Sequence, residues 1–197
     1  MNKILCTIAA GLLALPFAAR ADSEFSVVLE GGATRYNQSL SSGTDTGVNY
    51  GVRLGMMPTQ IFGFELGYLG SQNNLNETLR SGTASQTLMT NGGYGDLRLN
   101  VLPGPVTPYV FGGYGLTNVK VSNEATTGLH GKTTSTIPFG GGLEANLGAF
   151  KLGGRFQYNY MFDRLSNNSA TATGVSVDKG GNADNYGVSL DLGASFH

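Results

Sequence analysis

Eight charged residues lie in stretches of sequence that otherwise alternate between apolar side chains and small or polar ones. They are Glu30, Arg53, Glu65, Asp96, Arg98, Glu144, Arg155 and Asp191. A period of two places side chains on one face of a β-strand, so these charges would lie opposite the apolar residues. Five acids and three arginines enclosed on such a face must pair, because an isolated buried charge is very costly. The set predicts either a selectivity filter or proton path, or a network of ion pairs that plugs a narrow interior.

The sequence contains no recognisable set of residues for catalysis or for binding a cofactor. The two histidines, His130 and His197, lie in a polar segment and at the end of the sequence. Neither stands on a predicted strand beside a serine and a carboxylate, so no nucleophile and base pair is expected. Glycine runs such as 140–142 lack the helix and the lysine of a phosphate-binding loop. The sequence therefore predicts no enzyme, no cofactor and no metal site.

The first 21 residues predict a signal peptide. Lys3 precedes an apolar run at 4–18, and Ala19-Arg20-Ala21 forms a small-x-small cleavage site. The single cysteine, Cys6, lies inside this segment, so we expect no thiol and no disulfide in the mature chain. Removing Lys3 and Arg20 leaves 10 of the 12 basic residues against 13 acidic ones, a net charge of −3. That balance argues against a nucleic-acid partner.

The elements that would position the eight charges are strands with a two-residue period. We expect eight, at about 25–34, 48–56, 62–68, 86–102, 108–121, 137–147, 152–162 and 185–196. Short turns at 58–60, 103–105 and 148–149 alternate with long polar segments at 38–47, 72–85, 122–133 and 163–184. The phase of the fourth strand is readable only near its end. In the fifth, either Tyr109 and Phe111 or Val110, Tyr114 and Leu116 could face outward.

After the predicted cleavage site, no apolar run approaches the ~18 residues that a membrane-spanning helix needs, whereas a tilted strand crosses a bilayer with about 11. Residues 22–197 therefore predict one all-β domain, an eight-stranded antiparallel up-and-down transmembrane β-barrel. A soluble lipocalin-like barrel is the structural alternative, and it would turn its apolar face inward. The apolar faces of the predicted strands are continuous and aromatic and carry no scattered lysine or glutamate. This favours a barrel whose outer surface contacts lipid over a soluble one. In a barrel of this size the interior is only wide enough for side chains, which favours the plug over the conducting path.

The last strand has a pattern of its own. Within it, five residues match the spacing polar-x-Gly-x-x-apolar-x-apolar with a terminal aromatic: Asn185, Gly187, Leu190, Leu192 and Phe196. This spacing resembles the assembly signal in the closing strand of bacterial outer-membrane barrels, although His197 follows the aromatic here. Together with 108–113 and 142–145, it makes the chain similar to the small eight-stranded outer-membrane barrels, the family of the OmpA membrane domain, OmpX, Ail and the opacity proteins.

The resemblance implies a place in the Gram-negative outer membrane, and the even strand number places both termini in the periplasm. The implied partners are outer-membrane lipid and lipopolysaccharide, the barrel-assembly machinery, and a host or surface ligand bound by external loops. The implied role is structural or adhesin-like. A narrow porin-like channel is the first alternative, and a lipid A-modifying enzyme is the second. No cell-wall anchor is expected, because no peptidoglycan-binding domain follows the predicted barrel.

Overall fold

The computed structural model describes residues 23–37, 44–74, 87–121, 132–162 and 184–196. The predicted signal peptide lies outside these ranges, as does most of each long polar segment. All regular elements within the described residues are β-strands. None of the described residues belongs to a helix long and apolar enough to cross a membrane.

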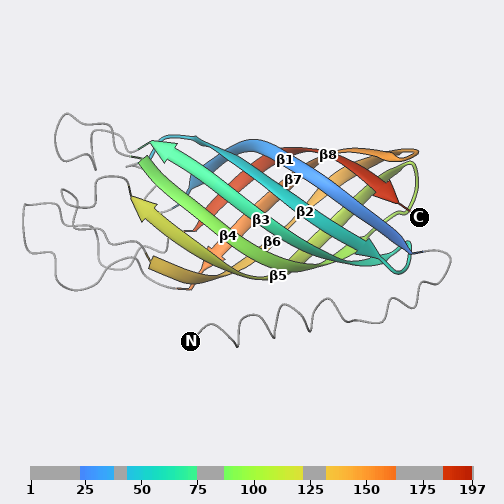
Figure 1. Ribbon diagram of the computed structural model, residues 1–197, viewed down its shortest axis with the longest axis horizontal. Helices are drawn as coiled ribbons and strands as arrows, with labels where there is room; N and C mark the ends of the chain where they lie inside the picture. The colour runs from blue at the N-terminus through green and yellow to red at the C-terminus, as the bar shows by residue number, and fades with distance from the viewer. Residues whose placement is uncertain (1–22, 38–43, 75–86, 122–131, 163–183, 197) are drawn as a thin grey trace, which may run out of the picture.

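Eight strands close into one barrel in the described residues (Figure 1). They are β1 (Glu24–Tyr36), β2 (Gly47–Met57), β3 (Phe62–Asn74), β4 (Thr87–Asn100), β5 (Val106–Val121), β6 (Lys132–Leu147), β7 (Phe150–Met161) and β8 (Asn185–Phe196). Each strand pairs antiparallel with its sequence neighbours, and β1 pairs with β8 from Phe25↔Phe196 to Tyr36↔Asn185. The predicted fold class, an eight-stranded antiparallel up-and-down barrel, is confirmed.

The two faces of the barrel wall have opposite chemistry. In β8, Leu190 faces outward and is 75% exposed, whereas Asp191 beside it faces the lumen and is 5% exposed. The same contrast recurs in β2, where Leu54 is 54% exposed and Arg53 is 1% exposed. Apolar residues outside and charged residues inside suit a hydrocarbon surrounding, where lipid-facing and lumen-facing positions alternate. The soluble lipocalin-like alternative, which needs the reverse arrangement, is wrong.

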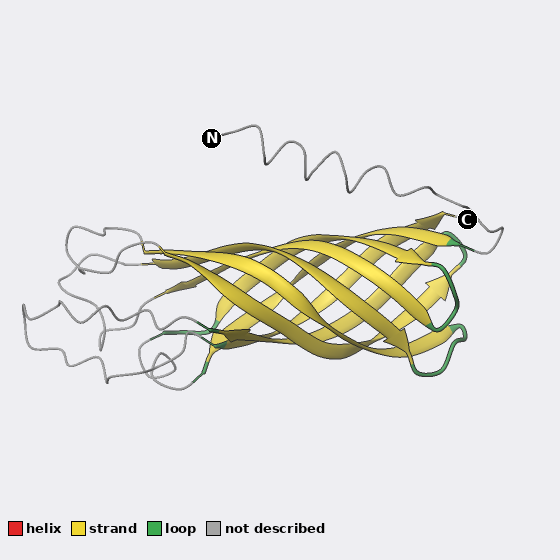
Figure 2. Cartoon of the chain, turned by 90° about the horizontal axis from the view of Figure 1, so that it is seen from below, coloured by secondary structure: helices red, strands yellow, loops and turns green. Residues whose placement is uncertain are grey.

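The strand connections differ at the two ends of the barrel. Short turns join β2 to β3, β4 to β5 and β6 to β7, and they lie at the end that also carries Glu24 and Phe196 (Figure 2). We call this the turn end and the opposite one the loop end. The tightest connection is Gly148-Ala149, where Gly148 has a φ of 70°. Glycine adopts that left-handed backbone without a steric penalty, which allows so short a turn.

Most strands differ from their predicted extents by one or two residues, and β3 and β6 differ by more. β3 runs to Asn74 and β6 begins at Lys132, so both continue into stretches that the sequence predicts as loop. β5 starts at Val106, two residues earlier than predicted. The extra residues of β3 and β6 are mainly polar, and a polar strand beyond the lipid belt lacks the apolar alternation by which a strand is recognised. Ladder hydrogen bonds to neighbouring strands still satisfy its backbone.

The sequence leaves undecided which side chains of β5 face outward, and the pairing of β5 with β4 and β6 decides it. Tyr109 and Phe111 face the lumen and are 2% and 6% exposed, whereas Tyr114 and Leu116 face outward. In β4, Tyr94 faces the lumen together with Asp96 and Arg98.

Candidate functional site

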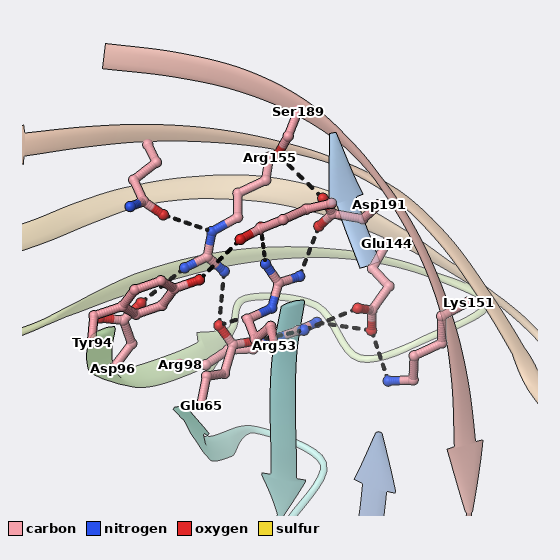
Figure 3. A network of polar contacts seen from close by, with 12 residues as sticks. Arg53, Glu65, Tyr94, Asp96, Arg98, Glu144, Lys151, Arg155, Ser189 and Asp191 are labelled. Carbon is pink, nitrogen blue, oxygen red and sulfur yellow. Dashed lines mark hydrogen bonds and ion pairs between the residues drawn. The ribbon is translucent and has the colours of Figure 1, made fainter. Parts of the chain in front are cut away.

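The structure brings the eight charged residues of the sequence pattern together in the middle of the lumen (Figure 3). Seven of the eight strands contribute to this group, which we call the charge cluster. None of its members exposes more than 6% of its surface. The remaining strand, β5, contributes aromatic rings instead of charges.

Arg53 on β2 joins three acids from three other strands. Its Nη1 donates to Glu30 Oε2 at 2.8 Å, and its Nη2 donates to Asp191 Oδ2 at 2.7 Å. Its Nε lies 3.4 Å from Glu65 Oε2. The guanidinium is planar and carries its donors in a fixed fork, so one side chain can join β1, β3 and β8 across the lumen.

Arg155 on β7 holds the opposite side of the cluster. Its Nη1 donates to Glu65 Oε2 at 2.7 Å, and its Nη2 donates to Asp96 Oδ2 at 2.9 Å. Its Nε donates to Gln157 Oε1 at 3.2 Å. The guanidinium also lies 3.3 Å from the centre of the Phe111 ring, whose negative face attracts a cation.

Arg98 on β4 forms the part of the cluster nearest the turn end. Its Nη1 and Nη2 each donate to Glu144 at 3.0 Å, a bidentate pair, and Nη1 also reaches Glu65 Oε1 at 3.3 Å. Its Nε donates to Asn100 Oδ1 at 2.9 Å. The guanidinium lies 3.9 Å from the centre of the Tyr109 ring. A bidentate pair between a guanidinium and a carboxylate is among the strong forms of hydrogen bond.

Three further residues, Glu24, Lys151 and Tyr94, contact the cluster, and the sequence did not predict them. Lys151 Nζ contacts Glu144 Oε1 at 2.9 Å and also pairs with Glu24 Oε1. Tyr94 OH donates to Glu30 Oε1 at 3.2 Å. The two-residue period of a strand could have identified two of them. Lys151 precedes Arg155 by four residues and Tyr94 precedes Asp96 by two, so each lies on the same face of its strand as a lumen-facing charge.

Glycines make room for the tyrosines of the lumen. A Cβ atom at Gly67 would overlap the ring of Tyr94, and one at Gly142 would overlap the hydroxyl of Tyr109. Glycine in a strand interior commonly marks such a close approach of a neighbouring group. The glycine-rich strands therefore allow two bulky rings to lie across the backbone beside the arginines.

The ion pairs engage most of the charged groups of the cluster. Each of the three guanidinium groups binds two or more carboxylates, and no described residues form a group of three His, Cys, Asp or Glu that could hold a metal. Both histidines lie outside the described residues. On the loop-end side of the cluster lies a partly open pocket of about 40 Å³, room for a few water molecules.

The five residues of the predicted assembly signal lie on both faces of β8. Asn185 and Gly187 face the lumen, and Asn185 Oδ1 accepts a hydrogen bond from Asn159 Nδ2 at 2.8 Å. Leu190, Leu192 and Phe196 face outward and are 75%, 60% and 59% exposed. The apolar part of the pattern therefore lies on the outer surface of the strand that closes the barrel.

Comparison with known proteins gives one family and several similar structures. Residues 5–196 match the family described as outer membrane protein beta-barrel domain. Neisserial surface protein A is 14% identical with a TM-score of 0.60, over 87% of this chain and 97% of that one. The N-terminal barrel of Pseudomonas aeruginosa OprF is 16% identical with a TM-score of 0.54, over 87% and 97%.

Yersinia pestis Ail, the attachment invasion locus protein, solved with the heparin analogue sucrose octasulfate, is 13% identical with a TM-score of 0.53, over 88% of this chain and 99% of that one. Identities this low show a shared fold. No curated protein matches the sequence.

Proposed function

Since the chain belongs to the outer membrane protein β-barrel family, we propose that it is a plugged barrel whose loop end interacts with partners at the cell surface. The observation that carries this proposal is the charge cluster, because its ion pairs link strands on opposite sides of the lumen, as from Arg155 on β7 to Glu65 on β3. A lumen filled in this way leaves the long connections as the part of the chain available for recognition, and recognition residues concentrate on loops held by a rigid scaffold.

The proposed orientation places the turn end and both termini in the periplasm. It is supported by the short connections at that end and the long ones at the other, the asymmetry typical of outer-membrane barrels. Aromatic residues face outward toward each end, as expected for membrane-interface girdles. They include Tyr50, Tyr68, Tyr114 and Tyr160 toward the loop end and Phe64, Phe150 and Phe196 toward the turn end.

The charge of the long connections narrows the class of ligand. The segments 38–43, 75–86, 122–131 and 163–183 contain four acidic and three basic residues, with many Ser, Thr, Asn and Gly. Segments of this composition carry many hydrogen-bonding groups and almost no net charge. We therefore expect a neutral partner, in contrast to the polyanionic heparin analogue bound to Ail.

Replacing the four segments by short Gly-Ser linkers tests the proposal. The linker variant should still fold, because β1–β8 and the charge cluster are unchanged, and cells that display it should lose attachment to the surfaces that wild-type cells bind. Equal attachment by folded wild-type and linker barrels would overturn the surface role. Grafting the segments one at a time would then locate the segment responsible.

A narrow channel is the second candidate function, and the partly open pocket beside the charge cluster is the observation that favours it. A conducting path would need that pocket to continue through the cluster to the turn end. We also propose that Leu190, Leu192 and Phe196 form the outward-facing signal read by the barrel-assembly machinery, and that lipid and lipopolysaccharide surround the apolar belt.

A further inference from the structure

One strand ladder is interrupted in the middle of the barrel wall. The β5–β6 ladder stops at Gly112↔Phe139 and resumes at Gly115↔Thr136, whereas the other seven ladders have no gap within the described residues. The register is the same on both sides of the gap, so no extra residue is inserted as in a β-bulge. We call the line between β5 and β6 the seam and this gap the break. The break comprises four residues: Gly113, Tyr114, Ile137 and Pro138.

Pro138 accounts for the break, because proline has no backbone N–H to donate to a ladder. The β6–β7 ladder continues through Pro138↔Asn159, so the missing N–H falls on the side of β5, opposite the carbonyl group of Gly113. That carbonyl therefore receives no ladder hydrogen bond from β6. Proline within sheets is normally confined to edge strands, strand ends and bulges, and a closed barrel has no edge strand.

Water from the lumen is the available donor for this carbonyl. Inside a wall surrounded by lipid, a backbone group without a hydrogen-bond partner is costly, and hydrocarbon supplies no donor. The partly open pocket is lined by Pro138 and also by Gly115 and Thr136, which pair directly after the break. The pocket has room for a few water molecules, so water reaches the seam beside the break from the lumen side.

Hydroxyl groups join β5 and β6 on both faces of the wall next to the break. On the outer face, Tyr114 OH and Ser135 Oγ share a hydrogen bond of 2.8 Å. On the lumen face, Thr136 Oγ1 donates to Thr117 Oγ1 at 2.9 Å. Hydrogen bonds between side-chain hydroxyl groups exchange readily for hydrogen bonds to water, so their net contribution to stability is small. The seam is therefore held here by weaker contacts than a continuous ladder provides.

We propose that the seam is the place where the wall of the folded barrel opens, and that water from the pocket then donates to the carbonyl group of Gly113. Opening would connect the pocket with the outer surface between Tyr114 and Phe139, which are 56% and 47% exposed. The charge cluster would stay closed, because the ladder beside Glu144 is continuous from Val106 to Gly112. Local opening of this kind is set by the few contacts that hold the segment, independently of global unfolding.

Amide hydrogen exchange of the mature barrel in lipid nanodiscs, followed by NMR, tests the proposal. Gly115 and Thr136 are the seam pair, and Glu65 and Asp96 are the reference pair in the uninterrupted β3–β4 ladder beside them. The seam amides should exchange at least about tenfold faster than the reference amides, the ratio expected for one lost hydrogen bond.

Pro138→Ala supplies the missing N–H and should slow exchange of the seam pair while leaving the reference pair unchanged. Pro108→Ala is the matched control. Pro108 also lies on β5, but its carbonyl already accepts a hydrogen bond from Val101 N at 2.8 Å near the turn end. This variant supplies no donor to the break and should leave exchange of the seam pair as fast as in the wild type.

A disulfide across the seam tests opening without changing the buried proline. A Cβ atom at Gly112 would lie 3.8 Å from Phe139 Cβ, the usual separation in a disulfide. The only cysteine of the sequence, Cys6, lies in the predicted signal peptide. Oxidised Gly112→Cys/Phe139→Cys should therefore slow exchange of the seam pair, and its reduced form should not. Equal exchange of the seam and reference pairs in the wild type would overturn the proposal. Fast seam exchange that persists in both Pro138→Ala and the oxidised variant would also overturn it.

Discussion

Arg155→Ala is the substitution that most directly disturbs the charge cluster. Arg155 is 2% exposed, and the variant would remove the hydrogen bonds to Glu65 at 2.7 Å and to Asp96 at 2.9 Å. Glu65 would retain Arg53 and Arg98 as neighbours. Asp96 would lose its ion pair with Arg155, and its other oxygen, Oδ1, is already buried without a hydrogen bond.

The expected loss of folding stability follows from this geometry. Breaking a buried ion pair by removing one partner costs roughly 3–5 kcal/mol, because a buried charge is left uncompensated. Loss of the Phe111 contact adds to this, by up to about 2 kcal/mol for a desolvated cation over a ring. We therefore expect the free energy of unfolding to fall by at least about 3 kcal/mol.

Denaturant unfolding in detergent micelles or lipid vesicles measures this change. The sequence contains no tryptophan, so circular dichroism or the heat-dependent shift of the folded barrel on gels should report folding. Arg35→Ala is the matched control, since Arg35 is exposed on the outer face of β1 and should change stability by less than about 0.5 kcal/mol. The double variant Arg155→Ala/Asp96→Asn should recover part of the loss, because it also removes the stranded charge. Equal stabilities for Arg155→Ala and Arg35→Ala would refute the view of the cluster as a tightly paired plug.

Three further outcomes are expected. Tyr94→Phe should lower the unfolding free energy by about 1 kcal/mol in the same assay, because it removes the hydrogen bond to Glu30; an unchanged value would mean that this bond adds no net stability. Phe196→Ala should reduce the amount of folded barrel in cell membranes while leaving refolding of the purified protein unchanged; equal membrane levels would argue against an assembly signal. An epitope inserted at Gly174 should bind antibody on intact cells and one at Gly104 should not, and the reverse result would invert the proposed orientation.

The sequence predicted the fold because period-two alternation is a direct consequence of strand geometry. It also predicted the eight charged residues as one set, since a charge between apolar neighbours in a strand has a known face. The phase of β5 could not be predicted in this way. In the stretch around Tyr109 and Phe111 both faces carry apolar or glycine residues, and pairing with β4 and β6 selects the face.

Lys151 and Tyr94 show a different limit. The sequence predicts that the seventh strand begins at 152, after Lys151. In the structure β7 already starts at Phe150, so Lys151 lies within it. Tyr94 looks like a lipid-facing aromatic until the phase of β4 is traced back from Asp96. The polar ends of β3 and β6 were missed because strands beyond the lipid belt need no apolar alternation.

The central claim is that the charge cluster closes the lumen, and single-channel recording in planar bilayers tests it most directly. If the paired side chains close the path from the loop end to the turn end, as we propose, the wild-type barrel should show no steady conductance. Arg155→Ala and Arg35→Ala, recorded alongside, separate a leak caused by opening the cluster from one caused by damaged protein. Leakage confined to Arg155→Ala agrees with the claim. A large, steady conductance from the wild type would contradict it and would support the narrow-channel function.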